Sequence, residues 1–229
     1  MLENIKEIKK RIAEDLLISI PQLTAFSQNK FYRIVGCLIV GIEVVNIPNI
    51  AGYKPHFMVY PLWENSVKKC LDAPYISFSI ENKKGLEFSI PYLKHSIYFE
   101  EVIECIEKQT PVLFYDSVTL KLLHDLVDSR FSDILVKSNS AQQVKLFEVK
   151  FYAALYTGSH IEVQNVLFQI QHASKSWNMT MFEMWYGKFD LRFEDLYEKI
   201  EKQEDFFKQI ELNKQEKIIS KLNISELVV

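Results

Sequence analysis

The stretch FYRIVGCLIVGIEVVNI, residues 31–47, decides the fold class of this chain. It is dense in β-branched Ile and Val, which lose side-chain freedom in a helix and pack well on a pleated sheet. Gly36 and Gly41 weaken a helix further. The stretch therefore predicts one long bent strand, or two strands that share a bulge at one of the glycines.

Further strands are predicted on the C-terminal side of this stretch. Residues 56–63 form one apolar run, and residues 75–80 and 86–92 flank the turn-like segment ENKKG, so they form a predicted hairpin. In both flanking runs apolar and polar residues alternate, which gives a strand one apolar and one polar face. This alternation is typical of a sheet that helices cover on one side only.

The distribution of proline divides the chain into two halves. All seven prolines lie between Pro21 and Pro111, and the 118 residues that follow contain none. Because proline removes a backbone donor and clashes inside a helix, its absence permits long helices. We predict an α+β fold: an antiparallel sheet of about four or five strands in the N-terminal half, helices packed on one face, and an all-helical C-terminal half. The halves, residues 1–111 and 112–229, lack a polar linker, so we expect one composite domain with a shared core.

The composition argues against several classes of function. The formal net charge is −3, whereas a nucleic-acid-binding protein needs a clustered basic surface. The longest apolar run, residues 34–42, is too short to span a bilayer, and the charged N-terminal segment is unlike a signal peptide. The three cysteines, Cys37, Cys70 and Cys105, form no paired or zinc-binding pattern. We therefore expect a cytoplasmic protein with no nucleic-acid or membrane partner.

Catalytic and cofactor-binding motifs are absent from the sequence. None of the five histidines stands at metal-ligand spacing from another ligand, and the sequence has no glycine-rich phosphate loop and no G-x-S-x-G element. We expect neither a bound metal nor a cofactor.

One short segment points to an enzyme. Glu148-Val149-Lys150 follows an apolar run, with Asp133 upstream, and this arrangement resembles the metal-binding core of the restriction-endonuclease-like fold. The resemblance implies that Asp133 and Glu148 would hold Mg²⁺ and that Lys150 would stabilise charge at the phosphate. It requires a strand, whereas the spacing of the neighbouring apolar residues favours a helix. On a helix, Glu148 and Lys150 lie about 200° apart and cannot share a ligand.

An acidic helix face is the first candidate surface for a partner. Glu100 and Glu104 recur at helical spacing on the polar side of a helix predicted at residues 99–109. Such a face could attract a basic partner, or it could simply be solvated.

The second candidate surface is rich in Met and aromatic residues. Residues 177–189 include Trp177, Met181, Trp185 and Tyr186. Trp and Tyr are enriched at binding hot spots, and Met adapts to irregular surfaces. The alternative is that these side chains pack the helical half onto the sheet.

In its general character the chain resembles bacterial toxin-immunity proteins and related uncharacterised cytosolic proteins. Like them it is short, mildly acidic, rich in aromatic residues and free of catalytic motifs. The resemblance implies a non-enzymatic protein that binds another protein, a basic toxin domain, and blocks it by occlusion. Two alternatives stay open: a scaffold or adaptor built on the helical hairpin predicted at residues 141–157 and 160–176, and the metal-dependent nuclease.

Overall fold

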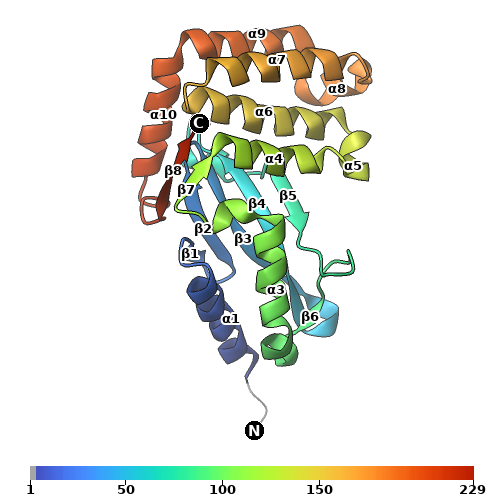
Figure 1. Ribbon diagram of the computed structural model, residues 1–229, viewed down its shortest axis with the longest axis vertical. Helices are drawn as coiled ribbons and strands as arrows, with labels where there is room; N and C mark the ends of the chain where they lie inside the picture. Colours follow the sequence, from blue (N-terminus) through green and yellow to red (C-terminus); the bar gives the residue numbers. More distant parts are fainter. Residues whose placement is uncertain (1–3) are drawn as a thin grey trace.

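The protein has a mixed α+β fold, as the sequence predicts, with a sheet in one layer and a stack of helices across its upper end (Figure 1). The computed structural model describes residues 4–229. Strands pair in the order β5-β4-β3-β2-β8-β7, with β1 also on β2 and β6 also on β4. The strands are β1 Thr24–Ser27, β2 Lys30–Val35, β3 Leu38–Ile47, β4 Gly52–Pro61, β5 Ile76–Ser79, β6 Ile90–Pro91, β7 Ser117–Thr119 and β8 Ile224–Val228.

The stretch at residues 31–47 forms two antiparallel strands, β2 and β3, with Val35 opposite Leu38. A tight turn at Gly36 and Cys37 joins them, so the junction is a hairpin turn rather than the predicted bulge. Gly36 has a φ of +56°, and a Cβ there would lie 2.7 Å from the Leu227 Cβ of β8. Only glycine combines this left-handed backbone with so close a neighbour.

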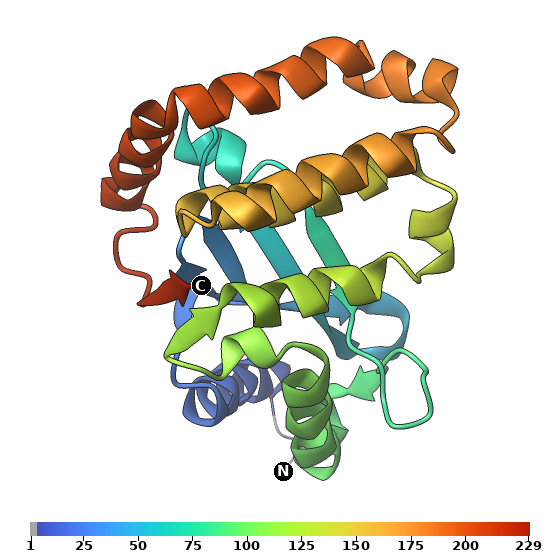
Figure 2. The same ribbon diagram turned by 45° about the horizontal axis from the view of Figure 1, so that its top comes forward.

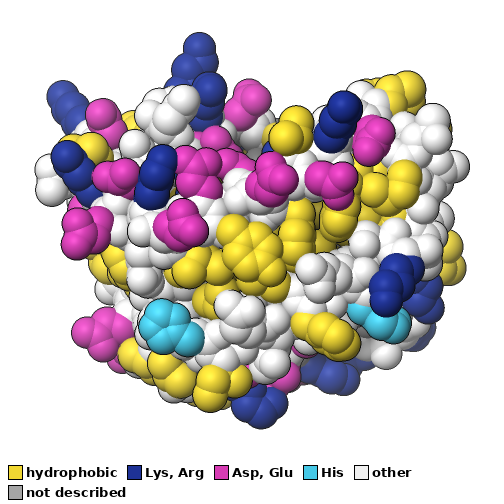
Figure 3. Space-filling view, turned by 90° about the horizontal axis from the view of Figure 1, so that it is seen from above, with side chains coloured by type: hydrophobic (Ala, Val, Ile, Leu, Met, Phe, Trp, Pro, Cys, Tyr) yellow, Lys and Arg dark blue, Asp and Glu magenta, His cyan; other side chains and the backbone are white. Residues whose placement is uncertain are grey.

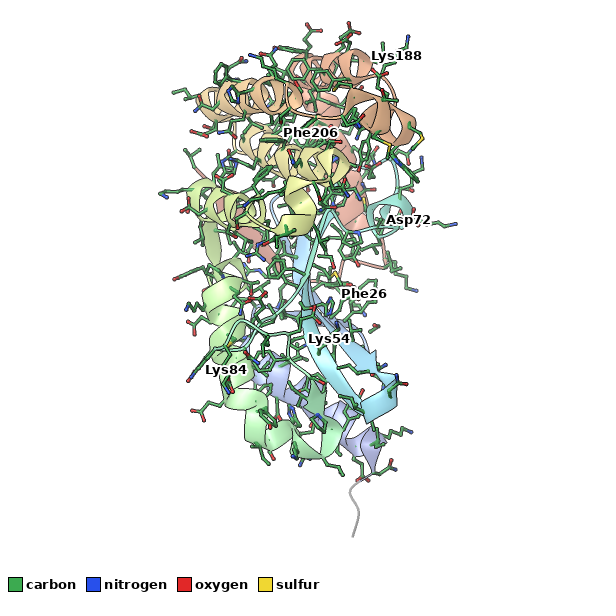
Figure 4. The ribbon with its side chains drawn as sticks, turned by 90° about the vertical axis from the view of Figure 1, so that its right-hand side faces the viewer. Phe26, Lys54, Asp72, Lys84, Lys188 and Phe206 are labelled. Atoms are coloured by element: carbon green, nitrogen blue, oxygen red, sulfur yellow. The ribbon has the colours of Figure 1, made fainter. Side chains whose placement is uncertain are left out.

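One face of the meander is mainly apolar, and the other is polar only at its Lys30 end, because Ile34 and Ile39 on that second face are also fully buried. The cross-strand row of Phe31, Ile42 and Phe57 is fully buried. On the opposite face, Lys30 lies beside Glu43, and the Lys30 ammonium donates to the Glu43 carboxylate over 3.0 Å. Figure 4 shows α3 and α4 on one side of the sheet, so these helices are part of the cover of its apolar face.

The predicted hairpin at residues 75–92 forms only in part. Asn82 does make the turn, because its side-chain oxygen accepts from the backbone N–H of Lys84. Beyond it, only an isolated bridge joins Glu81 to Glu87, and β6 pairs with β4 instead of β5. β5 is therefore a short strand at the edge of the sheet.

The C-terminal half is not all-helical, because it adds β7 and β8 to the sheet. β8 runs parallel to both β2 and β7 and lies between them. Ser225 and Leu227 are buried, whereas Ile224 and Glu226 are exposed, which is the alternation of a strand with one covered face. With these strands, and the short β1 and β6, the sheet exceeds the four or five strands predicted.

Ten α-helices and three short 3₁₀ turns make up the helical part of residues 4–229. The helices are α1 Ile5–Ser19, α2 Val67–Cys70, α3 His95–Gln109, α4 Leu120–Arg130, α5 Ile134–Lys137, α6 Ser140–Tyr156, α7 His160–Ser174, α8 Met179–Tyr186, α9 Phe189–Glu201 and α10 Gln203–Gln215. The 3₁₀ turns are Pro48–Ile50, Tyr92–Lys94 and Pro111–Leu113. The predicted helical hairpin is therefore present as α6 and α7.

Helix α6 is the centre of the helical layer. Figure 2 shows it crossing the sheet among α4, α7 and α9. Buried side chains occur on every side of it, and among them are the charged residues Glu148 and Lys150. A charge inside a protein must find a partner or lose its charge. The neighbours of these two side chains therefore decide what each one does.

Candidate functional site

The structure separates the three residues of the nuclease-like arrangement. Residues 144–150 are helical, not a strand. The Lys150 ammonium donates to Asp128 over 2.7 Å and to Gln169 over 3.0 Å, on the side of α6 that faces α4 and α7. Asp133 stands at the start of α5, 3.6 Å from Arg130. Because Glu148 and Lys150 contact different partners, the arrangement that the resemblance requires does not form.

Glu148 instead pairs with Arg192 of α9. The Arg192 Nε and Nη2 donate to Glu148 Oε1 over 3.1 Å and 2.7 Å. Glu148 is only 3% exposed, and its second oxygen, Oε2, is buried without a hydrogen-bond partner among the described residues. Burial raises the pKa of the Glu148 carboxyl, and the Arg192 guanidinium, with a smaller contribution from the nearby Tyr75 hydroxyl, opposes that rise.

A cleft of about 560 Å³ opens beside this pair. Its walls come from the segment after β4, from Tyr75, and from α6, α9 and α10. The aromatic wall is continuous: Trp63 stacks on Tyr152 with ring centres 4.2 Å apart, and Tyr152 stacks on Phe206 at 5.5 Å. Tyr75 meets Trp63 edge-on and its hydroxyl donates to Glu64 over 3.4 Å. In Figure 4, Phe206 lies inside the helical layer, whereas Lys188 lies at its outer surface.

Acidic side chains outnumber basic ones around the cleft. Five carboxylates line it, against three cationic side chains. They are Glu64, Glu148, Asp195, Glu198 and Asp205, against Arg192, Lys199 and Lys202. Arg192 already pairs with Glu148, and Lys202 pairs with Glu198. With five carboxylates against three cations, the lining has net negative charge.

The negative charge continues over the outer surface of α9. A second depression is lined by four carboxylates and no cationic side chain, and it shares Asp195 and Glu198 with the cleft. Residues 189–205 contain seven acidic and three basic residues, a net charge of −4, although the whole chain carries only −3. Figure 3 shows this end of the molecule, with acidic and basic side chains along one part of the surface and an apolar area beside them. We call residues 189–205 together with the cleft the acidic face.

The predicted Met- and aromatic-rich surface divides into an inner and an outer part. Trp177 is buried, stacks on Phe182 and donates its indole N–H to Gln143 over 2.8 Å. Met181 and Trp185 are exposed, at 49% and 72%. Tyr186 is half-buried, with the Arg192 guanidinium 5.2 Å above its ring. Of the four residues named in the prediction, Met181 and Trp185 are thus freely exposed, and Tyr186 helps to hold Arg192.

Glu100 and Glu104 lie elsewhere. Both are exposed on α3, and Glu104 forms an ion pair with Lys83 over 2.6 Å. In Figure 1, α3 stands at the opposite end of the molecule from α8 and α9. The structure therefore does not bring the two predicted surfaces together.

No sequence motif indicates Arg192 or the rest of the cleft. The local excess of charge in residues 189–205 was the available signal, because it can be counted without a structure.

Comparison of the chain with protein-family models, with curated proteins and with solved structures found no match. No helix within residues 4–229 has the length and apolar character needed to cross a membrane.

Proposed function

We propose that this protein binds a basic partner protein on its acidic face and does not catalyse a reaction. The observation that carries the proposal is the cleft, in which a stack of aromatic rings lies beside an excess of carboxylates. Opposite charge steers partners together and fixes their orientation, and aromatic side chains supply much of the binding energy at interfaces. Both features occur at the same place.

Toxin neutralisation is the specific form of this proposal. A cytoplasmic immunity protein would cover the basic active site of its toxin with the acidic face. The charge of −4 on residues 189–205 supports this form, since it concentrates more negative charge than the whole chain carries. Capture of a harmful partner also benefits from fast, charge-steered association.

The scaffold alternative receives less support. A groove for a partner helix needs an exposed apolar helix face. In the hairpin of α6 and α7, α6 is buried on every side and is already used by the fold, so only α7 contributes exposed large apolar side chains, Ile161 and Phe168.

A charge-reversal experiment tests the proposal. The partner would be co-purified from cells that make the protein, identified, and then studied as a pure protein by surface plasmon resonance. Replacing Glu194 and Glu201 by Lys should slow association about tenfold or more at low salt, and high salt should remove most of the difference. The matched control replaces Glu100 and Glu107 on α3 by Lys. Equal slowing by the control pair, or no slowing by the α9 pair, would overturn the proposal.

A further inference from the structure

The cleft has the features of a receptor for one side chain. Resting on the proposed function, we infer that the cleft binds a single arginine side chain of the partner protein through its guanidinium group. Three observations carry this inference: an unsatisfied buried acceptor, a guanidinium that the same site already holds, and the shape of the remaining walls.

The unsatisfied acceptor is Glu148 Oε2. It is buried, it belongs to a side chain that lines the cleft, and it has no hydrogen-bond partner among the described residues. A buried carboxylate oxygen normally accepts at least one hydrogen bond, and leaving it without one is costly. Because Oε2 itself is covered, a ligand that carries N–H donors into the cleft would supply that bond after a small rotation of the Glu148 carboxylate. Because the lining has net negative charge, a cationic donor is favoured over a neutral one.

Arg192 shows how this site accommodates a guanidinium. Its guanidinium lies over the Tyr186 ring at 5.2 Å and donates twice to Glu148 Oε1. The site thus holds one guanidinium between an aromatic ring face and a carboxylate. The cleft lining also holds the half-buried Trp63 and Tyr75 rings beside the Glu64 carboxylate, which is the same combination of aromatic ring and carboxylate.

Arginine fits these walls better than lysine does. A guanidinium is flat, stacks on aromatic rings, and donates in a fork to carboxylates, whereas an ammonium is a compact and strongly hydrated charge. The cleft volume of about 560 Å³ is within the range of sites that enclose small ligands. A side chain with its flanking backbone can therefore enter.

The inference can be tested with a small probe, the tripeptide acetyl-Ala-Arg-Ala-amide. Binding would be followed by tryptophan fluorescence and by calorimetry at low salt. The same peptide with citrulline, which has the shape of arginine but no charge, should bind about tenfold more weakly or not at all, and the lysine peptide should be intermediate. Equal binding of the arginine and citrulline peptides would overturn the inference.

Substitutions of residues that line the cleft test whether the arginine peptide binds there. Glu64→Gln and Asp195→Asn should each weaken the arginine peptide about threefold to fivefold, and Trp63→Leu about fivefold or more. Glu107→Gln and Trp185→Leu are the matched controls outside the cleft and should leave its affinity unchanged. A control that weakens binding as much as its cleft counterpart would contradict the assignment. Circular dichroism would confirm that each variant is folded.

The outcomes separate this inference from the proposed function. Suppose that the α9 charge reversal slows association with the partner protein but the arginine peptide does not bind. The inference that the cleft binds an arginine side chain is then wrong, and the proposed binding function stands. Suppose instead that the peptide binds in the cleft but the charge reversal does not change association with the identified partner. The proposed function is then wrong, and the inference that the cleft binds an arginine side chain stands.

Discussion

Helix α6 holds two buried charged side chains, Glu148 and Lys150, and they differ in how completely they are satisfied. Lys150 donates to both Asp128 and Gln169, which lie on α4 and α7. Glu148 receives two bonds on one oxygen and none on the other among the described residues. Complete satisfaction is what a structural ion pair needs, whereas a carboxylate that lines a cleft with one unpartnered oxygen can gain a hydrogen bond from a ligand. The contacts of Lys150 thus serve the fold, whereas Glu148 is part of the acidic face.

The largest expected effect comes from removing the partner of Glu148. Arg192→Ala would leave a buried carboxylate without its cation, and we expect the free energy of unfolding to fall by about 3 kcal/mol at neutral pH. Burial already raises the pKa of Glu148, so this loss should shrink as the pH falls and the carboxyl takes up a proton. Urea unfolding at neutral and mildly acidic pH measures both effects. Lys199→Ala on the same helix is the control, and an equal loss in that variant would show that Glu148 does not depend on Arg192.

The equivalent change on the other side of α6 should cost less. In Asp128→Ala, Lys150 keeps its bond to Gln169, and the Asp128 side chain is about half exposed, so we expect a loss of about 1–2 kcal/mol. Asp125→Ala is the matched control, because Asp125 lies on the same helix in an exposed pair with Lys121. That control should change the stability by less than about 0.5 kcal/mol. A loss in Asp128→Ala no larger than in the control would remove the distinction between buried and exposed pairs.

Replacing both members of the Glu148 pair tests whether the pair serves stability. Apolar side chains of similar volume often match or exceed the stability of a buried ion pair. We expect Glu148→Leu combined with Arg192→Met to lie within about 1 kcal/mol of the wild type, well above Arg192→Ala. Because it lacks the Glu148 carboxylate, the double variant should also no longer bind the arginine peptide. A large loss of stability in the double variant would instead make the pair a structural element, like Lys150 and Asp128.

The smallest expected effect is the pH response of the Lys150 side. The His124 Nε2 donates to the Lys150 carbonyl over 3.2 Å, and burial, followed by the charge of Lys150, lowers the His124 pKa. A lowered histidine pKa contributes stability above the ordinary pKa near 6.5 that is lost as the pH falls below it. Between about pH 7.5 and 5.5 we expect His124→Gln to lose less stability than the wild type, by somewhat under 1 kcal/mol. The exposed His160→Gln should keep the wild-type pH response, and a reduced response in that control would show that His124 is not the source.

Local sequence patterns predicted the elements whose contacts are local. The β-branched run at residues 31–47 did become two strands, and the α6–α7 hairpin lies where apolar spacing placed it, with Gly158 in a left-handed conformation at its turn. The helical state of residues 144–150 was also correctly favoured, because Phe147 and Phe151 follow helical spacing. In each case the deciding residues lie within a few positions of one another.

The features that could not be predicted depend on distant contacts. β8 is a strand of five residues whose partners in β2 lie about 190 residues earlier, and so short an alternation has no diagnostic value by itself. Glu148 and Arg192 are 44 residues apart, and no spacing rule connects them. The orphan oxygen of Glu148 is likewise a property of three-dimensional packing alone.

The position of β8 has a consequence for synthesis of the chain. β8 completes the part of the β2 edge around Ile34 and Val35, which β1 does not cover. A ribosome adds roughly 5–20 residues per second, so about 10–40 s pass between the emergence of Val35 and that of its partner Ser225. During that interval the nascent sheet presents an apolar strand edge on which other unfinished chains could pair. We therefore expect slow expression at low temperature, or a chaperone that covers strand edges, to raise the yield of folded protein.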